Sequence, residues 1–192
     1  MTMKTLIYSL LGPPFFLAAC TNGKNEKQDS AVADSTTKNV SRETNKVKKN
    51  QTAALLSGYL KLKNALTTDD DKQAAAAGSE IVAGFASFDE KSLTSEQARA
   101  YSDIRDDAKE HAEHIGSNAG NIAHQREHFD MLSKDMYDMI KLLGTDKPLY
   151  VDRCPMYNNN KGAMWVSEVK EIKNPYLGKT MPTCGTVKEE LK

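Results

Sequence analysis

All the histidines of the chain fall in one short segment, where their spacing suits metal binding. They are His111, His114, His124 and His128. The last two are four residues apart, so on a helix they share one face and lie about 6 Å apart. The first two are three residues apart on the preceding segment. If residues 116–120 form a turn between two helices, the pairs approach each other and provide a two- or three-histidine site for Cu(II) or Zn(II). The alternative is four solvated or half-buried histidines in local salt bridges.

Sulfur side chains form a second group near the C-terminus. They are Cys154, Met156, Met181 and Cys184. Two thiolates and two thioethers are soft ligands, which select Cu(I), and thiolates also bind Zn(II). Each half pairs a cysteine with a nearby methionine, so two turns could present four sulfurs to one ion. The alternative is a structural disulfide that closes a loop of about 30 residues and stabilises the fold by roughly 3 kcal/mol in the chain-entropy model.

Other kinds of chemistry find little support in the sequence. It contains neither a nucleophile elbow nor a glycine-rich phosphate loop, so we do not expect an enzyme. Lys and Arg together number 26 and so do Asp and Glu, which gives a net charge of zero. A nucleic-acid-binding protein needs a basic surface, so we expect no nucleic-acid partner.

The histidines must be positioned by helices, because apolar residues recur at helical spacing in four stretches. The stretches are residues 52–66, 69–88, 94–115 and 121–143. Thr94 and Gln97 have the spacing of a capping box at the start of the third stretch. The connections are short, so neighbouring helices should be antiparallel. The predicted fold class is all-α: an up-down antiparallel four-helix bundle with a loop-rich C-terminal tail.

That tail begins at about residue 148, where the composition changes. Proline, glycine and asparagine become frequent, and Leu149, Tyr150 and Val151 form a strand-like run. Both sulfur pairs and the single tryptophan, Trp165, lie in this part. We expect loops with a short helix or hairpin.

The first 50 residues have the pattern of a lipoprotein export signal followed by a tether. Lys4 precedes an apolar run, Leu6 to Ala19, that is shorter than the roughly 20 apolar residues of a membrane span. Leu17-Ala18-Ala19-Cys20 resembles a lipobox. The predicted organisation is therefore a signal peptide over 1–19, a lipidated disordered tether over 20–50 and a folded domain over 51–192. The alternative is an ordinary secretory signal in which Cys20 is incidental.

These features predict a location. Lipid on Cys20 would hold the protein in the cell envelope, with the membrane as its first partner. No acidic residue follows Cys20 directly, so we expect the outer membrane, with the domain facing the periplasm.

The tail resembles a known family. The residues that carry the resemblance are Leu149-Tyr150, Cys154-Pro155-Met156, Asn160-Lys161-Gly162-Ala163, Trp165-Val166-Ser167, Ile172, Asn174-Pro175-Tyr176, Gly178, Met181 and Cys184-Gly185. Together with residues 124–129 and 132–133 they are similar to DUF3347, a domain of unknown function in envelope lipoproteins and at the C-terminus of some heavy-metal efflux adaptors. The resemblance extends over about residues 52–190. Tyr157 and Leu177 depart from it, where a small residue and Phe are common.

The resemblance implies a role in handling copper or another heavy metal. Our hypothesis is a lipid-anchored periplasmic copper-binding protein that serves as chaperone or buffer for a metal-efflux adaptor or transporter. Copper is the first choice of ion and zinc the second. Cys154, Met156, Met181 and Cys184 would be soft ligands, and His114, His124 and His128 a second or shared set. The alternative is a structural or protein-interaction module of the envelope with a Cys154–Cys184 disulfide.

Overall fold

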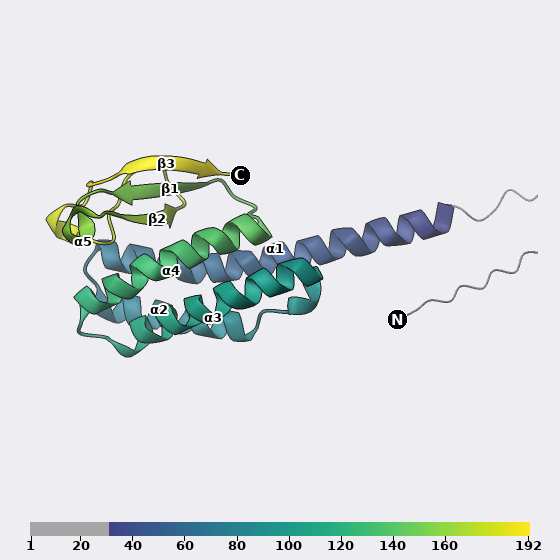
Figure 1. Ribbon diagram of the computed structural model, residues 1–192, viewed down its shortest axis with the longest axis horizontal. Coiled ribbons are helices and arrows are strands. Elements are labelled where there is room, and N and C mark those ends of the chain that lie inside the picture. Colours follow the sequence, from purple (N-terminus) through teal and green to yellow (C-terminus); the bar gives the residue numbers. More distant parts are fainter. Residues whose placement is uncertain (1–30) are drawn as a thin grey trace, which may run out of the picture.

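The computed structural model describes the backbone of residues 31–192 and the side chains of residues 42–192. The predicted signal peptide and the lipidation site at Cys20 lie outside the described residues. The elements follow in the order α1 (Ala31–Thr67), α2 (Asp71–Ala86), η1 (Glu90–Ser92), α3 (Ser95–Ser117), α4 (Ile122–Leu143), β1 (Leu149–Cys154), α5 (Tyr157–Asn160), β2 (Ala163–Ser167), η2 (Gly178–Thr180) and β3 (Thr186–Leu191). The four long helices form a bundle in which each packs on the next along the chain (Figure 1).

Helix ends were well marked in the sequence. Thr94 caps α3, and the predicted capping box with Gln97 is present in both directions. Asp70 accepts a hydrogen bond from the backbone N–H of Gln73 at the start of α2. Asn121 does the same for His124 at the start of α4. Side-chain oxygens at these positions satisfy backbone donors that the helix leaves unpaired, so they fix where each helix begins.

Helix α1 is longer than the first predicted stretch. It begins at Ala31 and therefore includes residues 31–50, which the sequence analysis placed in a flexible tether. This part is rich in Lys and Thr and exposes its side chains from residue 42 onward except for a half-buried Lys48. A helix that is polar all round receives little support from packing, and apolar periodicity gives no sign of it. None of the described helices is long and apolar enough to cross a membrane.

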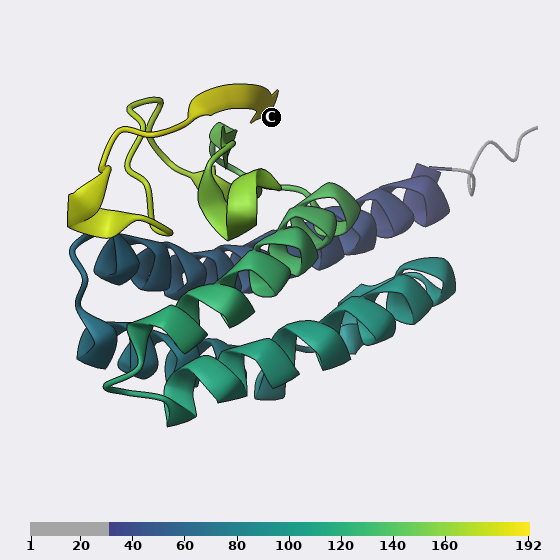
Figure 2. The same cartoon turned by 60° about the vertical axis from the view of Figure 1, so that its left-hand side comes forward.

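The tail folds into a sheet, which corrects the prediction of an all-α protein. Three antiparallel strands stand in the order β2-β1-β3, with Leu149 opposite Leu191 and Val151 opposite Val166. The sheet and the loops around it cover the side of the bundle formed by α1 and α4 (Figure 2). Strands β1 and β2 form a hairpin of the kind expected for the tail, whereas β3 lies far along the chain from its partner β1. Local periodicity therefore gives no sign of the third strand.

Tyr59 and Lys63 of α1 join the bundle to the sheet. The Tyr59 hydroxyl accepts a hydrogen bond from the backbone N–H of Val166 at 3.0 Å and lies 2.9 Å from Ser133 Oγ. The Lys63 ammonium is fully buried and lies 3.2 Å from a carboxylate oxygen of Glu168. The core is continuous from one layer to the other, since Phe129 of α4 stacks on Tyr59 and also contacts Tyr176 of the tail. Bundle and sheet are therefore one packed unit.

Candidate metal centre

The turn between α3 and α4 brings the histidines together, as their spacing predicted. Gln125, fully buried, donates from its side-chain amide to the carbonyl oxygens of Ile115 on α3 and Asp71 on α2. Together with the Asn121 cap, this fixes the hairpin between the last turn of α3 and the first turns of α4. The histidine-bearing turns of the two helices consequently face each other.

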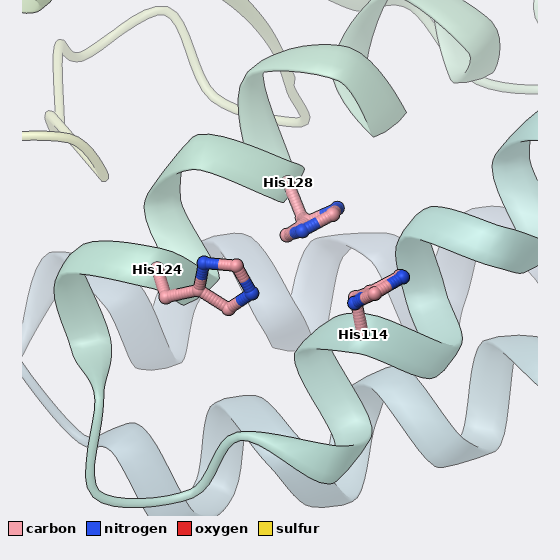
Figure 3. A group of neighbouring side chains, drawn as sticks. All are labelled: His114, His124 and His128. Atoms are coloured by element: carbon pink, nitrogen blue, oxygen red, sulfur yellow. The ribbon is translucent and has the colours of Figure 1, made fainter.

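Three imidazoles converge in this hairpin. His114 projects from α3, and His124 and His128 project from α4 toward it (Figure 3). One ring nitrogen from each lies within 4.8 Å of the other two. The rings of His114 and His128 stack with centroids 4.3 Å apart, and those of His124 and His128 meet edge to face at 4.6 Å. A metal–imidazole bond is about 2.0–2.1 Å, so one ion between the three nitrogens requires only small side-chain movements.

The surroundings keep His128 uncharged at neutral pH. Burial, followed by the neighbouring imidazoles of His114, His124 and His111, lowers the pKa of His128 to about 4. A neutral imidazole has a free lone pair, which is the form that binds a metal. The three imidazoles could therefore hold a metal ion.

Carboxylates stand at the edge of the histidine cluster. Glu127 lies 3.4 Å from His124 Nδ1, and Glu110 lies 4.0 Å from His114 Nε2. A carboxylate that accepts a hydrogen bond from one ring N–H orients the ring and makes the other nitrogen a better ligand. Glu127 thus leaves Nε2 of His124 for an ion, whereas Glu110 is too far from His114 to hydrogen-bond. His114 is exposed whereas His124 and His128 are half-buried, so the site opens to solvent on the α3 side.

His111 belongs to the same cluster but has a different position in it. Its Nδ1 lies 3.2 Å from Nδ1 of His128, and it comes one turn before His114 on α3. Burial lowers the pKa of His111, and the charges of Glu110 and Asp107 oppose this. The histidine spacing predicted His111 in the cluster but gave it no role as a ligand. In the structure His111 lies next to the His128 ring, within hydrogen-bonding distance of its Nδ1.

The sulfur residues are brought together only in part. Cys154 Sγ and Cys184 Sγ lie 3.0 Å apart, at the end of β1 and just before β3. The Met156 and Met181 side chains are exposed, at 49% and 37%. The cysteines are outside the histidine group. The two thiols therefore form a site of their own, and a four-sulfur Cu(I) site stays a prediction.

Asp135 lies near the histidine cluster and was not predicted as a site residue. It follows His128 by two turns on α4, and burial next to the charges of Asp107 and Asp138 raises its pKa to about 7. One of its carboxylate oxygens has no hydrogen-bond partner among the described residues. In the sequence, only its position on the face of α4 that packs against α3 pointed to Asp135.

The fold and the site thus define a helical-bundle domain with a surface histidine cluster and an appended sheet. Residues 55–147 match the family described as "Protein of unknown function (DUF3347)", so a DUF3347 domain is present there. The match covers the bundle and all four histidines but ends before β1, although the sequence resemblance was most specific in the tail. No curated protein and no solved structure matches the chain.

Proposed function

We propose that this protein binds a transition-metal ion through His114, His124 and His128, and that it serves as a copper chaperone or buffer for metal efflux in the cell envelope. The observation that carries the proposal is the convergence of three ring nitrogens within 4.8 Å from two rigidly paired helices. Imidazole is a common ligand of copper and zinc, and divalent copper binds such sites most strongly among the first-row metals.

The open side of the site supports a role in metal exchange. Structural zinc sites are closed by four protein ligands, whereas sites that exchange a ligand keep a position free. Three histidines, one of them exposed, leave room for a ligand from a partner protein or from solvent. An ion held in this way can be handed on, as a chaperone or buffer requires.

The envelope location rests on the N-terminal sequence. A lipid on Cys20 would keep the protein at a membrane while the bundle remained in the periplasm. Cys20→Ser should then move the protein from the membrane fraction to the soluble fraction of the envelope without changing metal affinity. Retention of this variant in the membrane fraction would argue against the lipid anchor and would leave the metal site untouched.

Metal affinity is the direct test of the site. The chain carrying Cys20→Ser, with its thiols alkylated, is titrated with Cu(II) and Zn(II) against a chromophoric chelator. Loss of an outer-shell partner typically weakens metal binding about 10–100-fold. His128→Gln removes a ligand itself, so it should weaken binding by at least this factor. Ser117→Ala, at an exposed position on the last turn of α3, is the matched control and should leave the affinity unchanged. A wild-type chain that fails to compete with a weak chelator would remove the proposal.

The second candidate is a structural or protein-interaction module of the envelope. The contact between the Cys154 and Cys184 thiols supports it, because a disulfide there would fix the tail on the bundle. A thiol count on non-reduced protein, combined with elemental analysis, separates the two functions. An oxidised pair without any metal retained by the histidines would favour the interaction module.

A further inference from the structure

The thiols of Cys154 and Cys184 are in direct contact although 30 residues separate them in the chain. Their sulfurs lie 3.0 Å apart, about 1 Å more than the S–S bond of a disulfide. We propose that these two residues are a redox-active dithiol that exchanges with small anionic disulfides at Cys184. The activity is independent of the histidine site, and it differs from that of a permanent structural bridge because the pair cycles between dithiol and disulfide.

Cys154 has the surroundings of a stabilised thiolate. It is buried at the end of β1, and the nearby backbone N–H groups of Met156 and Tyr157 and the side chain of Asn174 favour the charged form of its sulfur. Burial alone raises the pKa of this thiol, but these groups and the contact with Cys184 lower it below its ordinary value. The thiolate is the reactive form in exchange, so Cys154 is prepared to attack a neighbouring sulfur.

Asn174 is held in place to support this arrangement. It is fully buried, its side-chain amide also donates to the carbonyl oxygen of Cys184 at 2.6 Å, and its Oδ1 accepts from the backbone N–H groups of Tyr176 and Leu177. One side chain therefore binds the Cys184 backbone and also lies near the Cys154 sulfur. This fixes the distance between the two cysteines.

Cys184 is the sulfur that solvent can reach. It is half-buried and lines an open pocket of about 290 Å³. The pocket is bordered by Arg153, Pro155, Gly185, Thr186 and Lys188. Its lining contains two cations and no carboxylate. A small disulfide with carboxylate groups fits this charge pattern, and Cys184 is the sulfur it would meet first.

The exchange is balanced in two steps. The contact with Cys154 raises the pKa of Cys184, so Cys184 passes its proton to the Cys154 thiolate as its sulfur attacks the small disulfide. This forms a mixed disulfide and releases one thiolate of the small molecule, which takes the proton from Cys154. The Cys154 thiolate then attacks the Cys184 sulfur, forms the Cys154–Cys184 bond and releases the second thiolate. The two protons of the protein thiols pass to the two released thiolates. Two electrons thus move from the protein to the small disulfide, and an excess of the small thiol reverses both steps.

Oxidised and reduced glutathione are suitable probes. The Cys20→Ser chain, which keeps only this pair of thiols, is equilibrated at several glutathione ratios, quenched with acid, alkylated and weighed by mass spectrometry. The disulfide fraction should rise and fall reversibly with the ratio. Cys154→Ser should stop at the first step and carry one glutathione on Cys184, whereas Cys184→Ser should remain largely unmodified because Cys154 is buried.

The charge of the pocket is tested with a matched pair of disulfides. Lys188→Gln should slow the reaction with oxidised glutathione about three- to fivefold at low salt, as expected for loss of one charge contact in water. It should leave the rate with neutral hydroxyethyl disulfide unchanged. Equal slowing with both probes would overturn the anionic specificity. A pair that stays dithiol or stays disulfide at every ratio, or a Cys154→Ser chain that takes up no glutathione, would overturn the exchange itself.

Discussion

His111 Nδ1 lies 3.2 Å from His128 Nδ1, so one imidazole of the cluster orients another. The pKa values of both rings are lowered by burial, so both are neutral at pH 7 and only one of the facing nitrogens carries a proton. If that proton is on His128, its Nε2 has a free lone pair for an ion. If it is on His111, the Nε2 of His128 is protonated. Binding of an ion at Nε2 therefore selects the first arrangement, with His111 as the acceptor.

Loss of this acceptor should weaken metal binding. His111→Phe keeps a ring of similar size but cannot hydrogen-bond, and we expect about 10–100-fold lower affinity for Zn(II), the usual effect of an outer-shell substitution. His111→Asn retains an acceptor and should recover part of the loss. Competition with a chromophoric chelator measures the affinity, and nitrogen NMR reports the tautomer of His128. Equal affinities for His111→Phe and wild type, with wild type binding normally, would show that His111 has no part in positioning.

The metal-free domain should lose stability as the pH falls from about 6.5 toward 4. His128 has an ordinary pKa of 6.5, and in the folded state burial lowers it to about 4. Between these values the unfolded chain binds more protons than the folded one, so stability rises with pH across this window. Urea unfolding of wild type and His128→Gln at several pH values isolates the contribution of this residue. Parallel stability curves for the two proteins would contradict the expected linkage.

Much of the bundle was readable from the sequence because its signals are local. The Thr94 capping box marks the start of a helix, and histidines spaced three and four apart share helical faces. In the tail, a strand-like run at residues 149–151 and a hairpin were expected, and β1 and β2 form one. The third strand was not readable, since the pairing of Leu149 with Leu191 joins segments separated by loops rich in Pro, Gly and Asn. Periodicity within a stretch carries no information on such distant partners.

The sequence predicted which histidines come together, but not how their rings are oriented. Turn geometry was enough to bring the histidine pairs together, but ring orientation depends on side-chain contacts that spacing does not encode. The role of His111 behind His128 is one example. The methionines are another, because residue type alone does not show that the Met156 and Met181 side chains are exposed to solvent, and their role as ligands stays a prediction.

Asp135→Asn should stabilise the domain at neutral and higher pH. Burial and the charges of Asp107 and Asp138 raise the pKa of Asp135 from 3.8 to about 7, so the folded state binds more protons than the unfolded state between these values. Stability therefore falls as pH rises through this range, and an uncharged amide avoids the loss. We expect a gain of about 1 kcal/mol at pH 8, after allowance for solvent screening, and little change at pH 4.

Asp138→Asn provides the control for Asp135, since Asp138 is exposed on the same helix. Its effect should stay within about 0.5 kcal/mol, as is usual for surface substitutions. Thermal or urea unfolding of the three proteins at pH 4 and pH 8 gives the comparison. Equal gains from the two substitutions would mean that general charge reduction, and not burial of Asp135, is responsible.

Tyr59→Phe tests how the sheet is held on the bundle. The Tyr59 hydroxyl is fully buried, accepts from the backbone N–H of Val166 on β2 and lies beside Ser133 on α4, so it joins three elements at one point. Phenylalanine fills the same space but leaves the Val166 N–H without its partner. An unsatisfied buried donor costs about 1–3 kcal/mol, so we expect a loss of that size in urea unfolding.

Ser133→Ala distinguishes this contact from simple loss of a hydroxyl. In that variant Tyr59 still accepts from Val166, so the loss should be smaller, about 1 kcal/mol or less. Amide exchange at Val166 should accelerate in Tyr59→Phe and stay near wild type in Ser133→Ala, because only the first substitution frees that N–H. If Tyr59→Phe changed neither stability nor exchange at Val166, the sheet would have to be held by apolar packing alone, through Phe129 and Tyr176.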